Sequence, residues 1–325
     1  MQCLRSARDV PACDRCRREL ELTFARLVPL ASIQGYASAE VEQLTQHVVR
    51  LAEDVGDAPA AGAALGATWI VRIVRGECVA ARNAAVRLAS LGDAARNDVL
   101  LINGHFQAQI ACHHLGEFSL ARDHADVVMT LADRAPHVER CISVFDPVVA
   151  SLAESARNCW TTGYLARACS DCDAAVTLAR ELRHPDSLAF AWLFHAWING
   201  YRGDWHRCVA SSETGITIAR QSGSVQTLAW NGCVHGWAVG LVGHPTEGEA
   251  EIAAAVEASK RIMGHVALPQ FSAMMAEVLL ARGDLAAAEA CLTQAMEFEN
   301  SRDDRYFAAE VPATLWRMSR AAGPR

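Results

Sequence analysis

A glycine recurs along this chain at intervals of about 40 residues, and each one ends an apolar stretch with helical spacing. The seven positions are Gly35, Gly76, Gly116, Gly163, Gly203, Gly243 and Gly283, with intervals of 41, 40, 47, 40, 40 and 40 residues. A glycine just after a helix commonly takes the left-handed conformation, where a Cβ would be penalised. The spacing therefore predicts about seven helix–turn–helix units, with one helix before and one helix after each glycine.

Small residues occupy a fixed position five residues after the last six of these glycines. They are Ala81, Ala121, Ala168, Cys208, Gly248 and Ala288. Small side chains at matching places in paired helices let the two backbones approach closely, which is the pattern of a tetratricopeptide-like hairpin. The sequence predicts an all-α fold, namely a right-handed tetratricopeptide-like (TPR) α-solenoid of about seven repeats with a period of about 40 residues.

The predicted repeats divide the chain into an N-terminal extension, residues 1–16, and a repeat domain, residues 17–325. Helices are expected from 17–34 at one end to 305–320 at the other. The 47-residue interval contains a loop insertion at about 135–147, which should project from one edge of the stack or bend it.

Several segments resemble the TPR-like C-terminal repeat region of bacterial adenylate cyclase-like, signalling-ATPase and transcriptional-regulator proteins. The segments are RRELEL from Arg17, GYASAEVEQ from Gly35, FDPVVASLA from Phe145, LARELRHPDSLAFAW from Leu178 and GWAVGLVGHPTEGEAEI from Gly236. In that family the repeats follow a cyclase or DNA-binding domain and a signalling ATPase. The resemblance covers about Arg17 to Arg320, so no catalytic activity of the other modules is carried over to this chain.

The sequence predicts a chain that is not an enzyme. The only lysine, Lys260, lacks the preceding glycine of a phosphate-binding loop. The Cys-x-x-Cys pairs Cys13/Cys16 and Cys169/Cys172 lie in distant units, so they should not meet in one zinc site. A net charge of −7 argues against nucleic acid as a partner, and the absence of a long apolar run argues against a membrane span. We expect no cofactor, no metal and a cytoplasmic protein.

Polar side chains inside otherwise apolar first helices are candidates for contacts with a ligand in the concave groove. They are Arg72, Asn103, Gln107, Asn158, Asn199 and Asn231. Such side chains can also cap or bridge neighbouring helices. The eight tryptophans, most of them in the same helices, suit interface hot spots but also fill gaps between repeats, and Trp192, Trp205 and Trp230 are expected to belong to the core.

The leading hypothesis for function is a non-catalytic protein-interaction scaffold or regulatory module that binds a protein or peptide in its concave groove. The partner could be an ATPase or cyclase module of the kind that lies upstream in the resembling proteins, and self-association is a further outcome. One alternative is a repeat module that senses a small effector. Another is a detached fragment of a larger signalling regulator.

Overall fold

The computed structural model describes residues 12–34, 38–141, 144–263, 267–300, 303, 305 and 306. Within these ranges it contains α-helices and one 3₁₀-helix, but no strand. The elements are α2 (Ala12–Gln34), α3 (Ala39–Val55), α4 (Ala58–Val74), α5 (Cys78–Ala95), α6 (Asp98–His114), α7 (Phe118–Leu131), η1 (Ala132–Arg134), α8 (His137–Arg140), α9 (Pro147–Thr161), α10 (Leu165–Glu181), α11 (Pro185–Tyr201), α12 (Trp205–Ser222), α13 (Val225–Leu241), α14 (Pro245–Met263), α15 (Leu268–Arg282) and α16 (Leu285–Asn300). Of the helix predicted at 305–320, only Arg305 and Tyr306 belong to the described residues.

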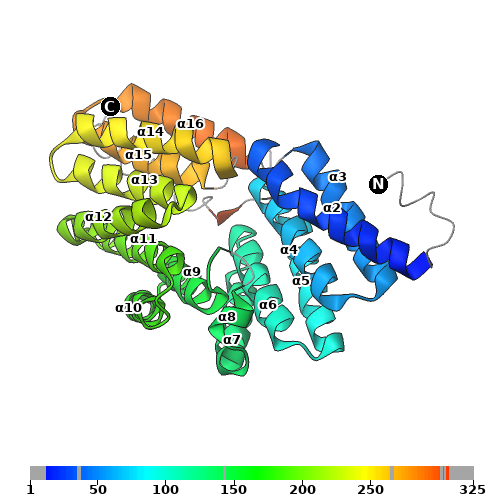
Figure 1. The fold of residues 1–325 in the computed structure, drawn as a ribbon. Coiled ribbons are helices and arrows are strands. Elements are labelled where there is room, and N and C mark those ends of the chain that lie inside the picture. Colours follow the sequence, from blue (N-terminus) through cyan, green and yellow to red (C-terminus); the bar gives the residue numbers. More distant parts are fainter. Residues whose placement is uncertain are drawn as a thin grey trace.

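The helices form seven antiparallel pairs that stack into a curved array (Figure 1). The first helices of six successive pairs, α4, α6, α9, α11, α13 and α15, pack against one another in that order. The second helices, from α3 to α16, each pack on the first helix of their own pair. The all-α solenoid of about seven units is therefore confirmed.

The repeat glycines end the first helix of each pair, as predicted. Gly76, Gly116, Gly163, Gly203, Gly243 and Gly283 all have positive φ angles, between 72° and 116°. Gly35 lies outside the described residues. Because a residue with a Cβ is disfavoured at these angles, the glycines fix where each first helix ends and the turn begins.

The small-residue position lies where the two helices of a pair cross. All six residues at this position are buried. At Gly248, an added Cβ would lie only 2.3 Å from the carbonyl oxygen of Gly236 on the facing helix α13. The close approach that the sequence pattern predicts is therefore present, and at this crossing it requires glycine.

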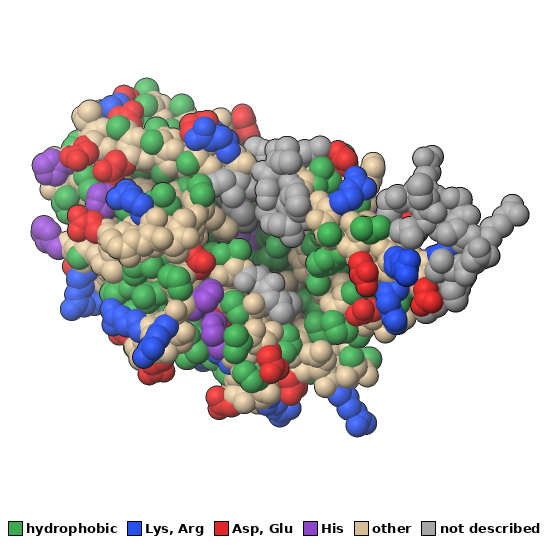
Figure 2. All heavy atoms as spheres, viewed as in Figure 1, with side chains coloured by type: hydrophobic (Ala, Val, Ile, Leu, Met, Phe, Trp, Pro, Cys, Tyr) green, Lys and Arg blue, Asp and Glu red, His purple; other side chains and the backbone are tan. Residues whose placement is uncertain are grey.

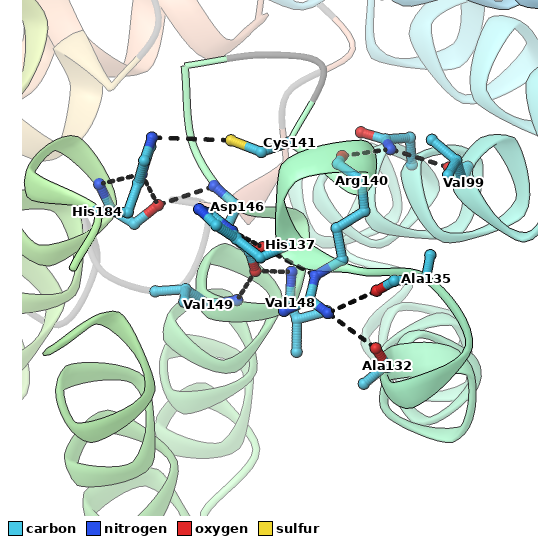
Figure 3. Close-up of polar contacts among 12 residues, drawn as sticks. Val99, Ala132, Ala135, His137, Arg140, Cys141, Asp146, Val148, Val149 and His184 are labelled. Carbon is cyan, nitrogen blue, oxygen red and sulfur yellow. Dashed lines mark hydrogen bonds and ion pairs between the residues drawn. The ribbon is translucent and has the colours of Figure 1, made fainter. Parts of the chain in front are cut away.

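The described residues of the insertion, 135–141 and 144–147, are bonded to the helices of the stack. It contains α8, and the carbonyl oxygen of Arg140 accepts a hydrogen bond of 2.9 Å from Asn103 Nδ2 on α6. Arg140 and Asp146 are both buried, and Asp146 Oδ2 accepts from Arg140 Nε at 2.8 Å and from His137 Nδ1 at 2.7 Å (Figure 3). Asp146 also caps α9, because its Oδ1 accepts from the backbone N–H groups of Val148 and Val149.

Residues 305 and 306, which follow the seventh pair in sequence, contact the third pair. The backbone N–H of Arg305 donates a 2.7 Å hydrogen bond to the carbonyl oxygen of His114 at the end of α6. Tyr306 is 1% exposed and packs on His113, with ring centroids 4.2 Å apart. A short segment that follows the seventh pair in sequence therefore lies against α6.

None of the described helices combines the length and the apolar character that a bilayer crossing would need.

Candidate functional site

A cavity of about 450 Å³ lies on the surface formed by α4, α6, α9, α11 and α13, which we call the inner face. Its walls are mainly aromatic and aliphatic, including Trp69, Phe106, Phe190, Trp197 and Trp230. Figure 2 shows a hollow near the centre of the molecule with hydrophobic side chains at its edges. A cavity of this size with mostly apolar walls and a few polar groups is typical of a ligand-binding site.

The repeat itself brings these side chains together. Six residues before the repeat glycine lie Ile70, Ile110, Arg157 and Trp197, all of which line the cavity. Nine before it lie Gln107 and Glu154, and thirteen before it lie Phe190 and Trp230, which also line it. Residues three or four apart share one face of a helix, so these positions form one stripe on successive first helices.

A buried ion pair forms the polar part of the wall. Arg157 Nη2 lies 2.5 Å from Glu154 Oε2, and both side chains are only 5–6% exposed. The guanidinium group also stacks over three aromatic rings at 4.8–5.8 Å, those of Phe194, Trp197 and Tyr306. Burial works against the charge on Arg157, but Glu154, Tyr306 and Tyr201 together outweigh it and raise the pKa of Arg157 above its usual value. Arg157 therefore remains charged, and its counter-charge is the Glu154 carboxylate beside it.

His113 lies behind this wall, in the last turn of α6, where its ring packs on Tyr306. Its Nδ1 is 3.3 Å from Asn158 Oδ1 on α9. Burial is the main cause that lowers the pKa of His113 well below 6.5, and the charge of Arg157 lowers this pKa further. The imidazole is therefore neutral in the folded protein.

Acidification is expected to destabilise the fold through His113. Because the pKa of His113 is lower in the folded chain than in the unfolded chain, the unfolded chain binds the proton first as the pH falls. This stability contribution is complete above about pH 6.5 and falls by about 1.4 kcal/mol per pH unit below it. Urea unfolding between about pH 8 and pH 5 measures how steeply the free energy of unfolding depends on pH. His113→Gln should reduce this slope by the equivalent of about one bound proton. His244→Gln, at a side chain 66% exposed, is the control and should leave the slope unchanged, whereas an unchanged slope in His113→Gln would contradict the prediction.

Of the six polar residues predicted to face a ligand, Gln107 lines the cavity. Its carbonyl oxygen accepts a 3.1 Å hydrogen bond from Trp69 Nε1, which ties α6 to α4 at the cavity wall. Gln107 is 7% exposed, and its Oε1 has no hydrogen-bond partner among the described residues. A ligand contact for Gln107 remains a prediction.

Three of the four asparagines connect helices of the scaffold, and the fourth bonds within its own helix. Asn103 joins α6 to the insertion, and Asn158 Nδ2 donates to the carbonyl oxygen of Phe118 at 3.1 Å. Asn231 Nδ2 donates to the carbonyl oxygen of Ala189 on α11 at 3.3 Å. Asn199 bonds within its own helix, where its Nδ2 lies 2.7 Å from the carbonyl oxygen of His195. None of these four side chains lines the cavity. The contacts of Asn103, Asn158 and Asn231 are of the alternative kind, in which polar residues bridge neighbouring helices.

Arg72 lies on the side of α4 that faces the second helices. It forms ion pairs with Glu42 on α3, at 2.6 Å, and with Glu77 at the start of α5. Burial alone would raise the pKa of Glu42, but the hydrogen bonds and charges of Arg75 and Arg72 outweigh it and lower this pKa. Arg72 therefore belongs to a charged cluster between the first and second units and is separate from the cavity.

The tryptophans divide between core and cavity. Trp230, predicted to be core, is 8% exposed and lines the cavity as well, while Trp192 and Trp205 are only partly buried. Trp69 and Trp197 complete the set of tryptophans in the cavity wall.

The cysteines that the structure describes are free thiols. Burial raises the pKa of Cys112 and of Cys208 to about 12, so both stay protonated. Burial also raises the pKa of Cys172 well above its usual value. Within the described part of the chain, no three His, Cys, Asp or Glu side chains are grouped so that they could hold a metal ion. The side chain of Cys13 lies outside the described residues.

Comparison with known proteins finds similarity at the level of fold. No family model matches the chain, and no curated protein matches it. The apo form of RapI matches with a TM-score of 0.62 at 13% identity, over 86% of this chain and 97% of RapI. A Rap protein complexed with competence and sporulation factor matches with a TM-score of 0.56 at 11% identity, over 95% of this chain and 99% of that protein.

A third solved structure is a signal transduction ATPase with numerous domains from Pyrococcus horikoshii, which carries a tetratricopeptide repeat sensor. It matches with a TM-score of 0.52 at 13% identity, over 97% of this chain and 52% of that protein. Identities this low show the fold alone. The fold is a TPR-like α-solenoid.

Within the TPR-like solenoid, the stripe of residues six, nine and thirteen before each glycine is the feature that the sequence prediction missed.

Proposed function

We propose that this TPR-like solenoid is a non-catalytic regulatory module whose inner face binds a segment of a protein or peptide partner. The chain's own residues 305 and 306 carry the proposal. They lie on α6 through a backbone hydrogen bond to His114, and the Tyr306 ring contacts Arg157 and His113. A segment outside the helical pairs is thus held by the carbonyl oxygen at the end of α6 and by an aromatic pocket, which are kinds of contact that a partner's backbone and side chains could also make on the inner face.

The neighbouring cavity would supply the anchor point for such a partner. Its aromatic walls offer a large apolar area, and interface hot spots are commonly aromatic groups in desolvated pockets. Gln107 is the sequence-predicted residue for which a direct contact is retained in this proposal. The Rap protein in complex with competence and sporulation factor and the ATPase with a TPR sensor support a regulatory role by analogy of fold.

The decisive experiment is selection of binders from a random peptide library on the full chain, followed by affinity measurement. The variant Ile110→Arg places a charge in the cavity wall at a partly exposed position. It should weaken the selected peptides on the order of tenfold or more, because their apolar anchor would face an unpaired charge. Leu120→Arg, at a side chain 47% exposed on α7, is the matched control and should leave the affinity unchanged.

Circular dichroism of both variants checks that the helices persist. Selected peptides that bind Ile110→Arg as tightly as the unmodified chain would contradict binding at the cavity. The finer identity of the partner, including a cytoplasmic ATPase or cyclase module, belongs to the same proposal and is tested by co-purification with such modules.

The size of the cavity favours a second candidate function, the sensing of a small effector. About 450 Å³ lies within the range of small-molecule sites, roughly 300–1,000 Å³. A thermal-shift screen with a metabolite panel separates the two functions. A stabilising metabolite that competes with the selected peptides would identify the cavity as an effector site.

A further inference from the structure

The cavity carries one carboxylate whose charge is not neutralised within the described chain. Its acidic and basic residues are Glu154, Arg157 and Asp186, besides His114. Glu154 and Arg157 pair with each other, so their charges cancel. Asp186 is partly exposed in the first turn of α11, and its Oδ1 accepts a 2.8 Å hydrogen bond from the neutral hydroxyl of Ser222. No ion pair involves Asp186 among the residues that the structure describes, so its negative charge remains available.

The aromatic wall favours the same sign of ligand charge. The face of an aromatic ring carries partial negative charge and attracts cations. Phe106, Phe190 and Trp230 belong to this wall and are each at least nine-tenths buried, so they are already held in place by packing. A flat apolar body would bury its area against these rings, while a positive group would find both the rings and Asp186.

We infer that the cavity binds an organic cation, a ligand that carries one positive charge next to a flat apolar body, with Asp186 as its charge partner. This inference rests on the proposed function, because it specifies the chemistry of the group that a ligand places in the cavity. An anion of the same shape would lose its water and gain no free cation, since Arg157 is already engaged by Glu154 and by the rings of Phe194 and Trp197. A free arylalkylamine and a peptide with a basic residue beside an aromatic one share this chemistry.

The test uses three probes with one indole body and different charges: tryptamine, N-acetyltryptamine and indole-3-propionate. Calorimetric titration of the full chain at about pH 8 measures the three affinities. Tryptamine should bind on the order of tenfold more tightly than the neutral and the anionic probe. Asp186→Asn retains an oxygen for Ser222 and should reduce the affinity for tryptamine to that of N-acetyltryptamine. Asp173→Asn, which removes an exposed carboxylate on α10, is the control and should preserve the preference.

Two outcomes with the unmodified chain overturn the inference: equal affinities for the three probes, or no binding of any of them. An unchanged preference in Asp186→Asn also overturns it.

The peptides acetyl-Trp-Lys-amide and acetyl-Trp-Glu-amide form a second arm. If the lysine peptide binds more tightly than tryptamine, the cation comes from a peptide, and the reverse order assigns it to a free amine. Selected peptides that lose affinity for Ile110→Arg while the three indoles bind equally would leave the proposed function intact and remove only the charge assignment.

Discussion

Asp146→Asn is expected to lower the free energy of unfolding by about 3–5 kcal/mol, because it leaves a buried arginine without its counter-charge. The asparagine retains an oxygen that can cap α9, so the effect reports the loss of the carboxylate charge that faces Arg140 and His137. In the unmodified chain Arg140 Nε lies 2.8 Å from Asp146 Oδ2, and the two side chains are 9% and 0% exposed. The remaining partners of the guanidinium group, the carbonyl oxygens of Ala132 and Ala135, are polar but uncharged. Urea unfolding followed by circular dichroism measures the change.

The geometry around Asp146 suggests why the effect should reach beyond the insertion. The Asp146 backbone N–H donates to Ser187 Oγ at 2.8 Å, and Ser187 Oγ also contacts His184 Nδ1 at 2.7 Å (Figure 3). One residue thus connects the insertion, α9 and the start of α11. Asp133→Asn, at an exposed carboxylate in η1, is the control and should change the stability by less than about 0.5 kcal/mol. The double variant Arg140→Met/Asp146→Asn should recover part of the loss, and a single-variant loss below about 1 kcal/mol would show that the pair contributes little.

Gly248→Ala is expected to destabilise the chain by about 1–3 kcal/mol, although alanine favours a helix more than glycine does. The added Cβ would lie 2.3 Å from the Gly236 carbonyl oxygen and 2.7 Å from the Gly240 backbone nitrogen. Both are backbone atoms, so the clash can be relieved only if α13 and α14 move apart. Thermal unfolding of the full chain measures the change.

Gly66→Ala is the matched control for Gly248→Ala. At Gly66, the nearest atom to an added Cβ is the end of the Gln107 side chain, at 3.4 Å. That side chain is flexible, so the substitution should stabilise α4 by about 0.5–1 kcal/mol through helix propensity. The two substitutions are expected to change the stability in opposite directions. If both stabilised the chain, helix propensity would outweigh the close approach of α13 and α14.

The sequence was sufficient to predict the helical pairs because glycine and small residues recur at positions that backbone geometry constrains. It was not sufficient to predict the cavity. The residues six before the glycines, such as Ile70, Arg157 and Trp197, share a direction toward the inner face but no chemistry, so no residue type marks the stripe. Asn199 lies four before its glycine, which is roughly 200° around the helix from the stripe. Position relative to the repeat glycine, rather than polarity within an apolar helix, therefore determines which residues lie on the stripe.

The folding of the insertion and the return of residues 305 and 306 could not be derived from local pattern either. Each depends on contacts between segments that are distant in sequence, such as Asn103 with Arg140 and His114 with Arg305. Hydrogen-bond partners of this kind become visible only once the stacked helices place α6 next to both segments.

The contact between Arg305 and His114 alters how cooperatively the array can unfold. In a linear solenoid each unit touches only its neighbours, so the ends can fray while the middle stays folded. Here residue 305, which follows the seventh pair in sequence, is bonded to the third pair, so loss of α16 and of this contact should also expose the end of α6. Amide hydrogen exchange at α6 should therefore accelerate when residues 305 and 306 are released, which couples two regions that a nearest-neighbour description would treat as independent.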